Sequence, residues 1–143
     1  MNHDNFIKFP TGKNKGKFCT NCMRYNARYV TCDILAIKNN KILLVLRKKD
    51  PDKDKYCLPG GYLNWDENLI DCANRELIEE TGYEAKNLEL FTILDDPHRP
   101  DGRQNITIVY ITKDIKKIKD FQDDETIEIK FFDINKINKM NLA

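Results

Sequence analysis

The segment between Asn68 and Gly82 constrains the fold of this chain more than any other, because it carries both end signals of a helix. Asn68 can cap the first turn, with Asp71 three residues on, and Gly82 stands where a left-handed residue commonly ends a helix. Between these ends, apolar and small residues recur at helical spacing. They form the expected packing face, which consists of Ile70, Ala73, Leu77 and Thr81.

Strand-like segments surround this helix without a regular alternation of strand and helix. The expected strands are residues 29–37, 41–47, 88–94, 104–112 and 126–132. Asn39 and Asn40 tolerate left-handed backbone angles, so the first two strands should form a hairpin. Residues 113–124 are a charged connection with room for a short helix, and residues 134–140 are expected to begin a last helix. This order predicts an α/β fold with a mixed sheet.

The composition excludes several classes of protein. Among 143 residues there is no Ser, and the only His residues are His3 and His98, so neither a Ser-His-Asp triad nor a three-His zinc site can form. The net charge of +1 favours neither a nucleic acid polymer nor an anionic membrane as partner. The longest aliphatic run is residues 42–46, far short of a membrane span, and the N-terminus does not resemble a signal peptide. We therefore expect a cytoplasmic protein.

Residues 1–28 show no sustained period, and we interpret them as an irregular N-terminal arm before a single domain of residues 29–143. The arm contains Cys19 and Cys22, a CxxC half-site typical of a zinc ribbon. The remaining cysteines offer no second pair at the required spacing, so a remnant, or a site shared between two chains, is favoured over a zinc site within one chain. These cysteines are Cys32, Cys57 and Cys72, of which Cys72 is expected on the carboxylate side of the helix.

Three carboxylates lie on one face of the expected helix, at Glu76, Glu79 and Glu80. Like charges at this spacing destabilise a helix, and a divalent cation such as Mg²⁺ or Mn²⁺ removes the conflict. Arg75 lies beside them and can pair with Glu67 or Glu79. The alternative is a solvated charged face, which charge runs on helices usually are. The Gly60–Gly61 turn before the helix favours the metal, because its backbone can approach a phosphate or donate a carbonyl to the same ion.

Residues 61–83, GYLNWDENLIDCANRELIEETGY, resemble the Nudix box, with every Gly, Glu and Arg of that motif in place. The two departures are mild, since Tyr83 replaces an aliphatic residue and Tyr56 stands where Trp is frequent. The resemblance implies an α/β/α sandwich that hydrolyses a nucleoside diphosphate linked to another moiety, using Mg²⁺ (or Mn²⁺). It also implies the site residues. Glu76, Glu79 and Glu80 would ligate one to three ions, Gly60 or Gly61 would add a carbonyl, and Arg75 would hold the catalytic carboxylates in place.

The family often takes a further carboxylate from outside the box as general base. Glu125, before the last expected strand, is the candidate here, with Asp124 and Glu128 behind it. The alternative for Glu125 is a solvated loop carboxylate.

The loop at residues 95–103 is similar to a stretch of ADP-ribose pyrophosphatases, as is the Asp123–Asp124 pair. Arg47, Arg99 and Arg103 are therefore candidate substrate contacts, because guanidinium forks match phosphate oxygens. The first expectation is hydrolysis of ADP-ribose to AMP and ribose 5-phosphate. The alternatives are hydrolysis of oxidised nucleoside triphosphates and nucleotide binding without catalysis.

The resemblance also bears on assembly. Dimers are common among similar proteins, so a homodimer is possible for this one. The subfamily usually continues into a C-terminal helix, whereas this sequence stops at Ala143. Either that helix is missing or a partner covers this edge of the core.

Overall fold

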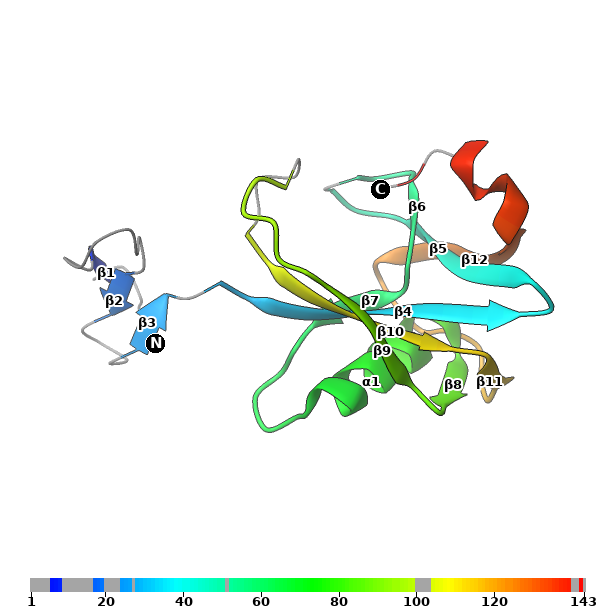
Figure 1. The fold of residues 1–143 in the computed structure, drawn as a ribbon, viewed down its shortest axis with the longest axis horizontal. Helices are drawn as coiled ribbons and strands as arrows, with labels where there is room; N and C mark the ends of the chain where they lie inside the picture. Colours follow the sequence, from blue (N-terminus) through cyan, green and yellow to red (C-terminus); the bar gives the residue numbers. More distant parts are fainter. Residues whose placement is uncertain are drawn as a thin grey trace.

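A computed structural model of the chain describes residues 6–8, 17–19, 24–26, 28–50, 52–99, 104–139 and 142. Its main sheet has the strand order β12-β5-β4-β10-β9, with β7 paired to β4 and β6 to β5 (Figure 1). β4 and β10 run parallel and the other neighbours run antiparallel. The strands are β4 (Val30–Lys38), β5 (Lys41–Arg47), β6 (Tyr56–Cys57), β7 (Gly60–Tyr62), β9 (Glu89–Leu94), β10 (Ile106–Thr112) and β12 (Thr126–Asp133).

The fold class predicted from the sequence is confirmed as α/β with a mixed sheet. The helix α1 (Leu69–Thr81) and the short 3-10 helix η1 (Ile134–Lys139) lie on opposite sides of the strands in the view of Figure 1. The predicted boundaries of α1 are also correct. The Asn68 side chain accepts a hydrogen bond from the N–H of Asp71, and Gly82 adopts a left-handed φ of 75°.

The hairpin between β4 and β5 creates the space for the site. Asn39 and Asn40 have φ angles of 51° and 60°, as the predicted tight turn requires. Beyond this turn, β4 and β5 pair at only two positions and then separate. The strand β7 pairs with β4 at residues 31–33, while β6 pairs with β5 at residues 45–46. The sequence predicts a turn at Gly60–Gly61, but the structure places both glycines in β7, where they pair with Asp33 and Cys32. The bend that leads into them, which together with the two glycines we call the glycine turn, therefore lies between two strands that diverge.

The core lies between α1 and one face of the sheet, and α1 is rotated from the predicted packing face. Ala73, Leu77 and Thr81 are buried as predicted, but Ile70 is half exposed and Cys72 is fully buried. The prediction for Ile70 is therefore wrong, whereas Cys72 lies on the carboxylate side as predicted, since its thiol accepts a hydrogen bond from Arg75 at 3.8 Å. The thiol of Cys72 lies 3.6 Å from the carbonyl oxygen of Tyr62. On this side α1 contacts β7, and Glu76 and Glu80 lie at the glycine turn.

Three segments differ from the sequence prediction. The connection after β10 contains a strand, β11 (Asp114–Lys117), which pairs with β8 (Tyr83–Lys86) and is no helix. Backbone pairing with β8 determines this, since Ile115 is the only buried residue of β11. The last helix is 3-10, and the N-terminal arm contains three short antiparallel strands, β1 (Phe6–Lys8), β2 (Lys17–Cys19) and β3 (Arg24–Asn26). Cys22 lies outside the described residues, so the CxxC prediction stays open.

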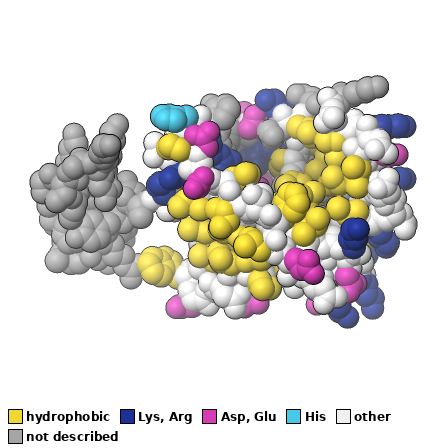
Figure 2. Space-filling view, viewed as in Figure 1, with side chains coloured by type: hydrophobic (Ala, Val, Ile, Leu, Met, Phe, Trp, Pro, Cys, Tyr) yellow, Lys and Arg dark blue, Asp and Glu magenta, His cyan; other side chains and the backbone are white. Residues whose placement is uncertain are grey.

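Apolar side chains gather on the face of the molecule that Figure 2 shows. The edge strand β9 contributes four side chains that are about half exposed, which are Leu90, Phe91, Ile93 and Leu94. Within the described ranges, no helix is both long and apolar enough to cross a membrane.

Candidate metal and substrate site

The glycine turn lies against the carboxylates of α1, and neither glycine leaves space for a side chain. A Cβ on Gly61 would lie 2.5 Å from the carboxylate carbon of Glu76, and a Cβ on Gly60 would collide with Asp33 and the carbonyl of Cys32. The backbone N–H of Gly60 donates to the Glu80 carboxylate at 2.9 Å. The predicted approach of this turn to the acidic face of α1 is therefore present in the structure.

Arg75 joins the start of α1 to its acidic face. Its Nε and Nη2 donate to the two oxygens of Glu67 at 2.8 and 2.9 Å, and its Nη1 donates to Glu76 at 2.8 Å and Glu79 at 3.2 Å. Nη2 also donates to the carbonyl of Tyr62 at 3.0 Å. Hydrogen bonds from Arg75 lower the pKa of Glu67 to about 2, so Glu67 is ionised at neutral pH.

Glu76 and Glu80 are the less exposed members of the acidic face, whereas the side chain of Glu79 is 50% exposed. Burial, together with the neighbouring carboxylates of Glu76, Asp123 and Asp33, raises the pKa of Glu80 to about 9 against the opposing hydrogen bond from Gly60. Burial likewise raises the pKa of Glu76. Several carboxylates thus share one partly desolvated region.

In the part of the chain that the structure describes, no three Asp, Glu, His or Cys side chains already stand in a metal-binding arrangement. The donor set nevertheless fits a hard divalent cation, because Glu76 and Glu80 lie together at a glycine turn with raised pKa values. Such a cation would favour the ionised form of both carboxylates, against the burial and mutual repulsion that raise their pKa values.

Two of the three candidate arginines, Arg47 and Arg99, act on the same carboxylate, that of Asp33. Arg47 ends β5 and Arg99 follows β9, and both lower the pKa of Asp33. The Nη1 of Arg99 donates to the hydroxyl of Thr107 at 3.0 Å. Arg103 lies outside the described residues.

The structure places the candidate base Glu125 at the surface. Its side chain is 59% exposed and lies 3.9 Å from the Nζ of Lys49. Asp124 is also exposed, and Glu128 accepts a hydrogen bond from the hydroxyl of Tyr56. Asp123 acts on both Glu76 and Glu80, whose pKa values it raises. Asp123, from the same loop as Glu125, is therefore a further carboxylate that acts on Glu76 and Glu80.

Sequence reasoning missed Asp33, which lies in the middle of β4 and is mostly buried. Burial raises the pKa of Asp33 to about 6, against the opposing effect of Arg99 and Arg47. A signal was available in the sequence, since Asp33 is the only charged residue in the otherwise uncharged run YVTCDILAI. A carboxylate in a strand expected to be buried on both faces requires a local partner.

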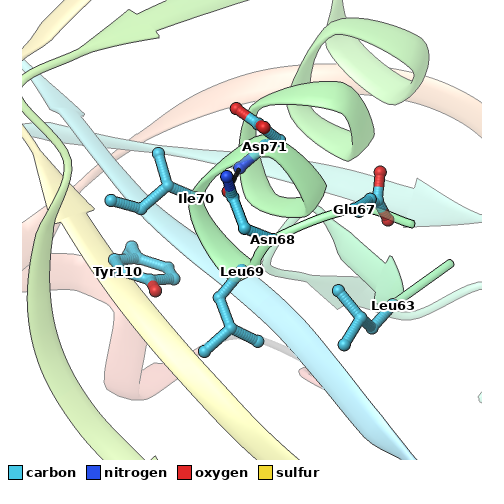
Figure 3. A pocket seen from close by; sticks show the side chains of 7 residues that line it. All are labelled: Leu63, Glu67, Asn68, Leu69, Ile70, Asp71 and Tyr110. Atoms are coloured by element: carbon cyan, nitrogen blue, oxygen red, sulfur yellow. Dashed lines mark hydrogen bonds between the residues drawn. The ribbon is translucent and has the colours of Figure 1, made fainter. Parts of the chain in front are cut away.

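A cavity of about 530 Å³ lies at the start of α1, away from Glu76 and Glu80. Figure 3 shows its apolar lining of Leu63, Leu69, Ile70 and Tyr110 beside the polar residues Glu67, Asn68 and Asp71. Glu67 is the only residue of this lining that contacts Arg75, so the cavity adjoins the site without containing its carboxylate cluster.

Comparison with known proteins supports the resemblance. An ADP-ribose pyrophosphatase from Methanocaldococcus jannaschii is 36% identical over 112 residues, which are 78% of this chain and 65% of that enzyme. The chain thus spans slightly less than two thirds of that relative. A bifunctional NMN adenylyltransferase/ADP-ribose pyrophosphatase from Francisella tularensis, solved with AMP and a manganese ion, is 28% identical with a TM-score of 0.67. That match covers 82% of this chain and 38% of the other.

The NUDIX domain of Shewanella oneidensis NrtR, solved with ADP-ribose, has the same fold with a TM-score of 0.74. It is 22% identical, and the match covers 88% of this chain and 84% of the other. The family model for the NUDIX domain matches residues 27–143, which include the glycine turn, α1 and all strands of the main sheet. This chain therefore belongs to the Nudix family.

Proposed function

We propose that this chain is a pyrophosphohydrolase that cleaves ADP-ribose to AMP and ribose 5-phosphate in the presence of Mg²⁺ or Mn²⁺. The observation that carries the proposal is the desolvated pair Glu76 and Glu80 against the glycine turn, beside two arginines. The resemblance of the loop at residues 95–103 and the similarity to an ADP-ribose pyrophosphatase support the choice of substrate.

In this proposal Glu76, Glu79, Glu80 and the carbonyl of Gly60 hold the metal. When bound, the cation neutralises charge on the phosphoryl oxygens and acidifies the attacking water. The N–H of Gly60 orients Glu80, and Arg75 holds Glu76 and Glu79 on the same face of α1.

Arg47 and Arg99 bind the pyrophosphate oxygens in this scheme, together with Arg103 from the same loop as Arg99. Glu125 accepts the proton of the attacking water as general base. Asp123 is the second candidate for the base, because it acts electrostatically on Glu76 and Glu80. Separate Glu125→Gln and Asp123→Asn variants distinguish the two, since the base is the residue whose loss lowers kcat by about 100-fold or more.

The test is a substrate profile of the purified chain with Mg²⁺ and with EDTA. ADP-ribose, NADH, dinucleoside polyphosphates and 8-oxo-dGTP are compared, and the products are identified by chromatography. We expect the highest kcat/KM for ADP-ribose, with AMP as product and no turnover in EDTA. Preference for 8-oxo-dGTP would support nucleotide-pool cleaning, and binding of ADP-ribose without turnover would support a non-catalytic domain.

We also propose that the chain forms a homodimer in the cytoplasm, binding no membrane and no nucleic acid polymer. The exposed apolar side chains of the edge strand β9 support self-association, because an edge strand can pair with a second copy. Sedimentation of the chain and of a Phe91→Glu variant tests this assembly. A wild-type chain that sediments as a monomer at micromolar concentration would contradict it.

A further inference from the structure

Asp33 occupies the place where the two halves of the proposed site meet. In the sheet, it lies opposite Gly60 of β7 on one side and opposite Val109 of β10 on the other. Gly60 in turn donates its N–H to Glu80. One residue of β4 is thus adjacent to the turn that holds a carboxylate of the acidic face.

The charges of two arginines act on the carboxylate of Asp33. Arg99 has the stronger and Arg47 the weaker favourable effect on its ionised form, while Glu76 opposes it. The guanidinium of Arg99 is held by Thr107, which lies opposite Thr31 of β4, and the two threonine hydroxyls are 2.8 Å apart. Thr31 and Asp33 are two residues apart on a strand, so both side chains point to the same face of the sheet.

The Asp33 carboxylate packs directly against Gly60. It reaches the position that a Cβ of Gly60 would occupy. A Glu at this position would carry its carboxylate one methylene further, away from the position that the Asp33 carboxylate holds against Gly60. An Asn would keep the shape and lose only the charge.

We propose that Asp33 is a positioning residue, whose carboxylate holds the guanidinium group of Arg99 beside the Gly60 turn and the carboxylates of α1. Its role is to fix the direction of the fork that binds the pyrophosphate. In this role Asp33 does not itself bind the metal. The inference rests on the proposed function, since it assigns the arginines to the substrate.

The experiment is a double-mutant cycle of Asp33→Asn and Arg99→Ala, with the Kd of ADP-ribose from calorimetry and KM and kcat from turnover. We expect Asp33→Asn to weaken binding and raise KM by about tenfold or more, with a smaller effect on kcat. In the Arg99→Ala background the same change should cost less than about threefold, because the partner is already absent. The matched control is Asp114→Asn, which changes an exposed aspartate on β11 and should leave all three constants unchanged.

Two further variants separate positioning from a general loss of structure. Arg99→Lys keeps the charge but loses the fork, so it should reproduce the rise in KM caused by Asp33→Asn without altering the fold. Asp33→Glu keeps the charge but moves the carboxylate, so its Kd for ADP-ribose should be raised as in Asp33→Asn and not return to the wild-type value. Binding of Mn²⁺, measured by electron paramagnetic resonance, should change by less than about threefold in Asp33→Asn, unlike in Glu80→Gln.

An additive cycle, or a loss of Mn²⁺ affinity as large as that of Glu80→Gln, would overturn the positioning role. These results differ from a failure of the proposed function. A wild-type chain that binds ADP-ribose without hydrolysing it would contradict the enzyme, while the calorimetric cycle would still decide the role of Asp33.

Discussion

A single guanidinium, that of Arg75, contacts three carboxylates and a backbone carbonyl. Its contact with Glu67 lies on the loop before α1, whereas Glu76 is the next residue of the helix and Glu79 lies about one turn further on. A planar fork can serve several acceptors at once, whereas an ammonium group acts as one point charge. Arg75 therefore links the entry of α1 to its acidic face.

Replacing Arg75 with Lys should destabilise the fold by about 1–2 kcal/mol and lower kcat/KM, because several charge-assisted hydrogen bonds are lost. The pH dependence gives a specific check. The pKa of Glu67 is lowered to about 2 in the folded chain, so its contribution is complete above its ordinary pKa and is lost as the pH falls through 2. Urea denaturation should thus show the difference between wild type and variant shrinking toward pH 2. A constant difference would contradict the assignment.

Replacing Glu80 with Gln should have opposite effects on stability and on activity. Without metal, the buried carboxyl of Glu80 has a pKa of about 9, so its ionisation opposes folding at alkaline pH. The variant should be more stable than wild type by about 1–3 kcal/mol at pH 8 in EDTA. In Mg²⁺ its activity should fall by about 100-fold, since a ligand is lost.

The matched control for this variant is Glu79→Gln. The Glu79 side chain is half exposed. The free energy of unfolding of the Glu79→Gln variant in EDTA should therefore differ from that of wild type by less than about 0.5 kcal/mol. Thermal melts in EDTA and assays in Mg²⁺ measure both effects. A loss of stability in Glu80→Gln at pH 8 would show that the pKa of the Glu80 carboxyl is not raised in the folded chain.

At the scale of elements, the site depends on where the short strand β7 lies between β4 and α1. Gly60 faces backbone of β4, and Gly61 faces the side chain of Glu76. Backbone cannot move without disturbing the sheet, but a carboxylate can rotate away. The two glycines of one turn should therefore respond differently to the same substitution.

Gly60→Ala should destabilise the fold by about 2 kcal/mol or more, because the new methyl group meets Cys32 and Asp33. Gly61→Ala should cost less than about 1 kcal/mol and lower activity by about tenfold or more, because it displaces Glu76. Urea denaturation and turnover of ADP-ribose in Mg²⁺ measure the two effects, and each variant serves as the control of the other. Equal loss of stability in both would contradict this division.

At the scale of the whole molecule, stability without metal should fall as the pH rises from 5 to 8. The pKa values of Asp33 and Glu80 are raised to about 6 and about 9, so the folded chain holds protons that the unfolded chain releases. Mg²⁺ should reverse the trend, contributing about 2.7 kcal/mol at a concentration of 100 times its Kd. Denaturation across this range, with EDTA and with Mg²⁺, is the measurement. A rise in stability between pH 5 and 8 in EDTA would contradict it.

The sequence by itself determined α1 and the β4–β5 hairpin, because their signals are local. Asn68, Gly82 and the Asn39–Asn40 turn act on backbone within a few residues of themselves. The spacing of Glu76, Glu79 and Glu80 is likewise a property of one helix. The sequence alone therefore predicts the carboxylates of the candidate site and the resemblance to the family.

Only the tertiary structure decided which neighbours these residues have. The rotation of α1 that buries Cys72 and exposes Ile70 follows from packing against β7, and β11 is a strand because β8 lies beside it. The burial of Glu80 and the meeting of Asp33 with Arg47 and Arg99 join residues from separate strands and loops. Burial and charge interactions depend on distance in space, which spacing along a chain does not specify.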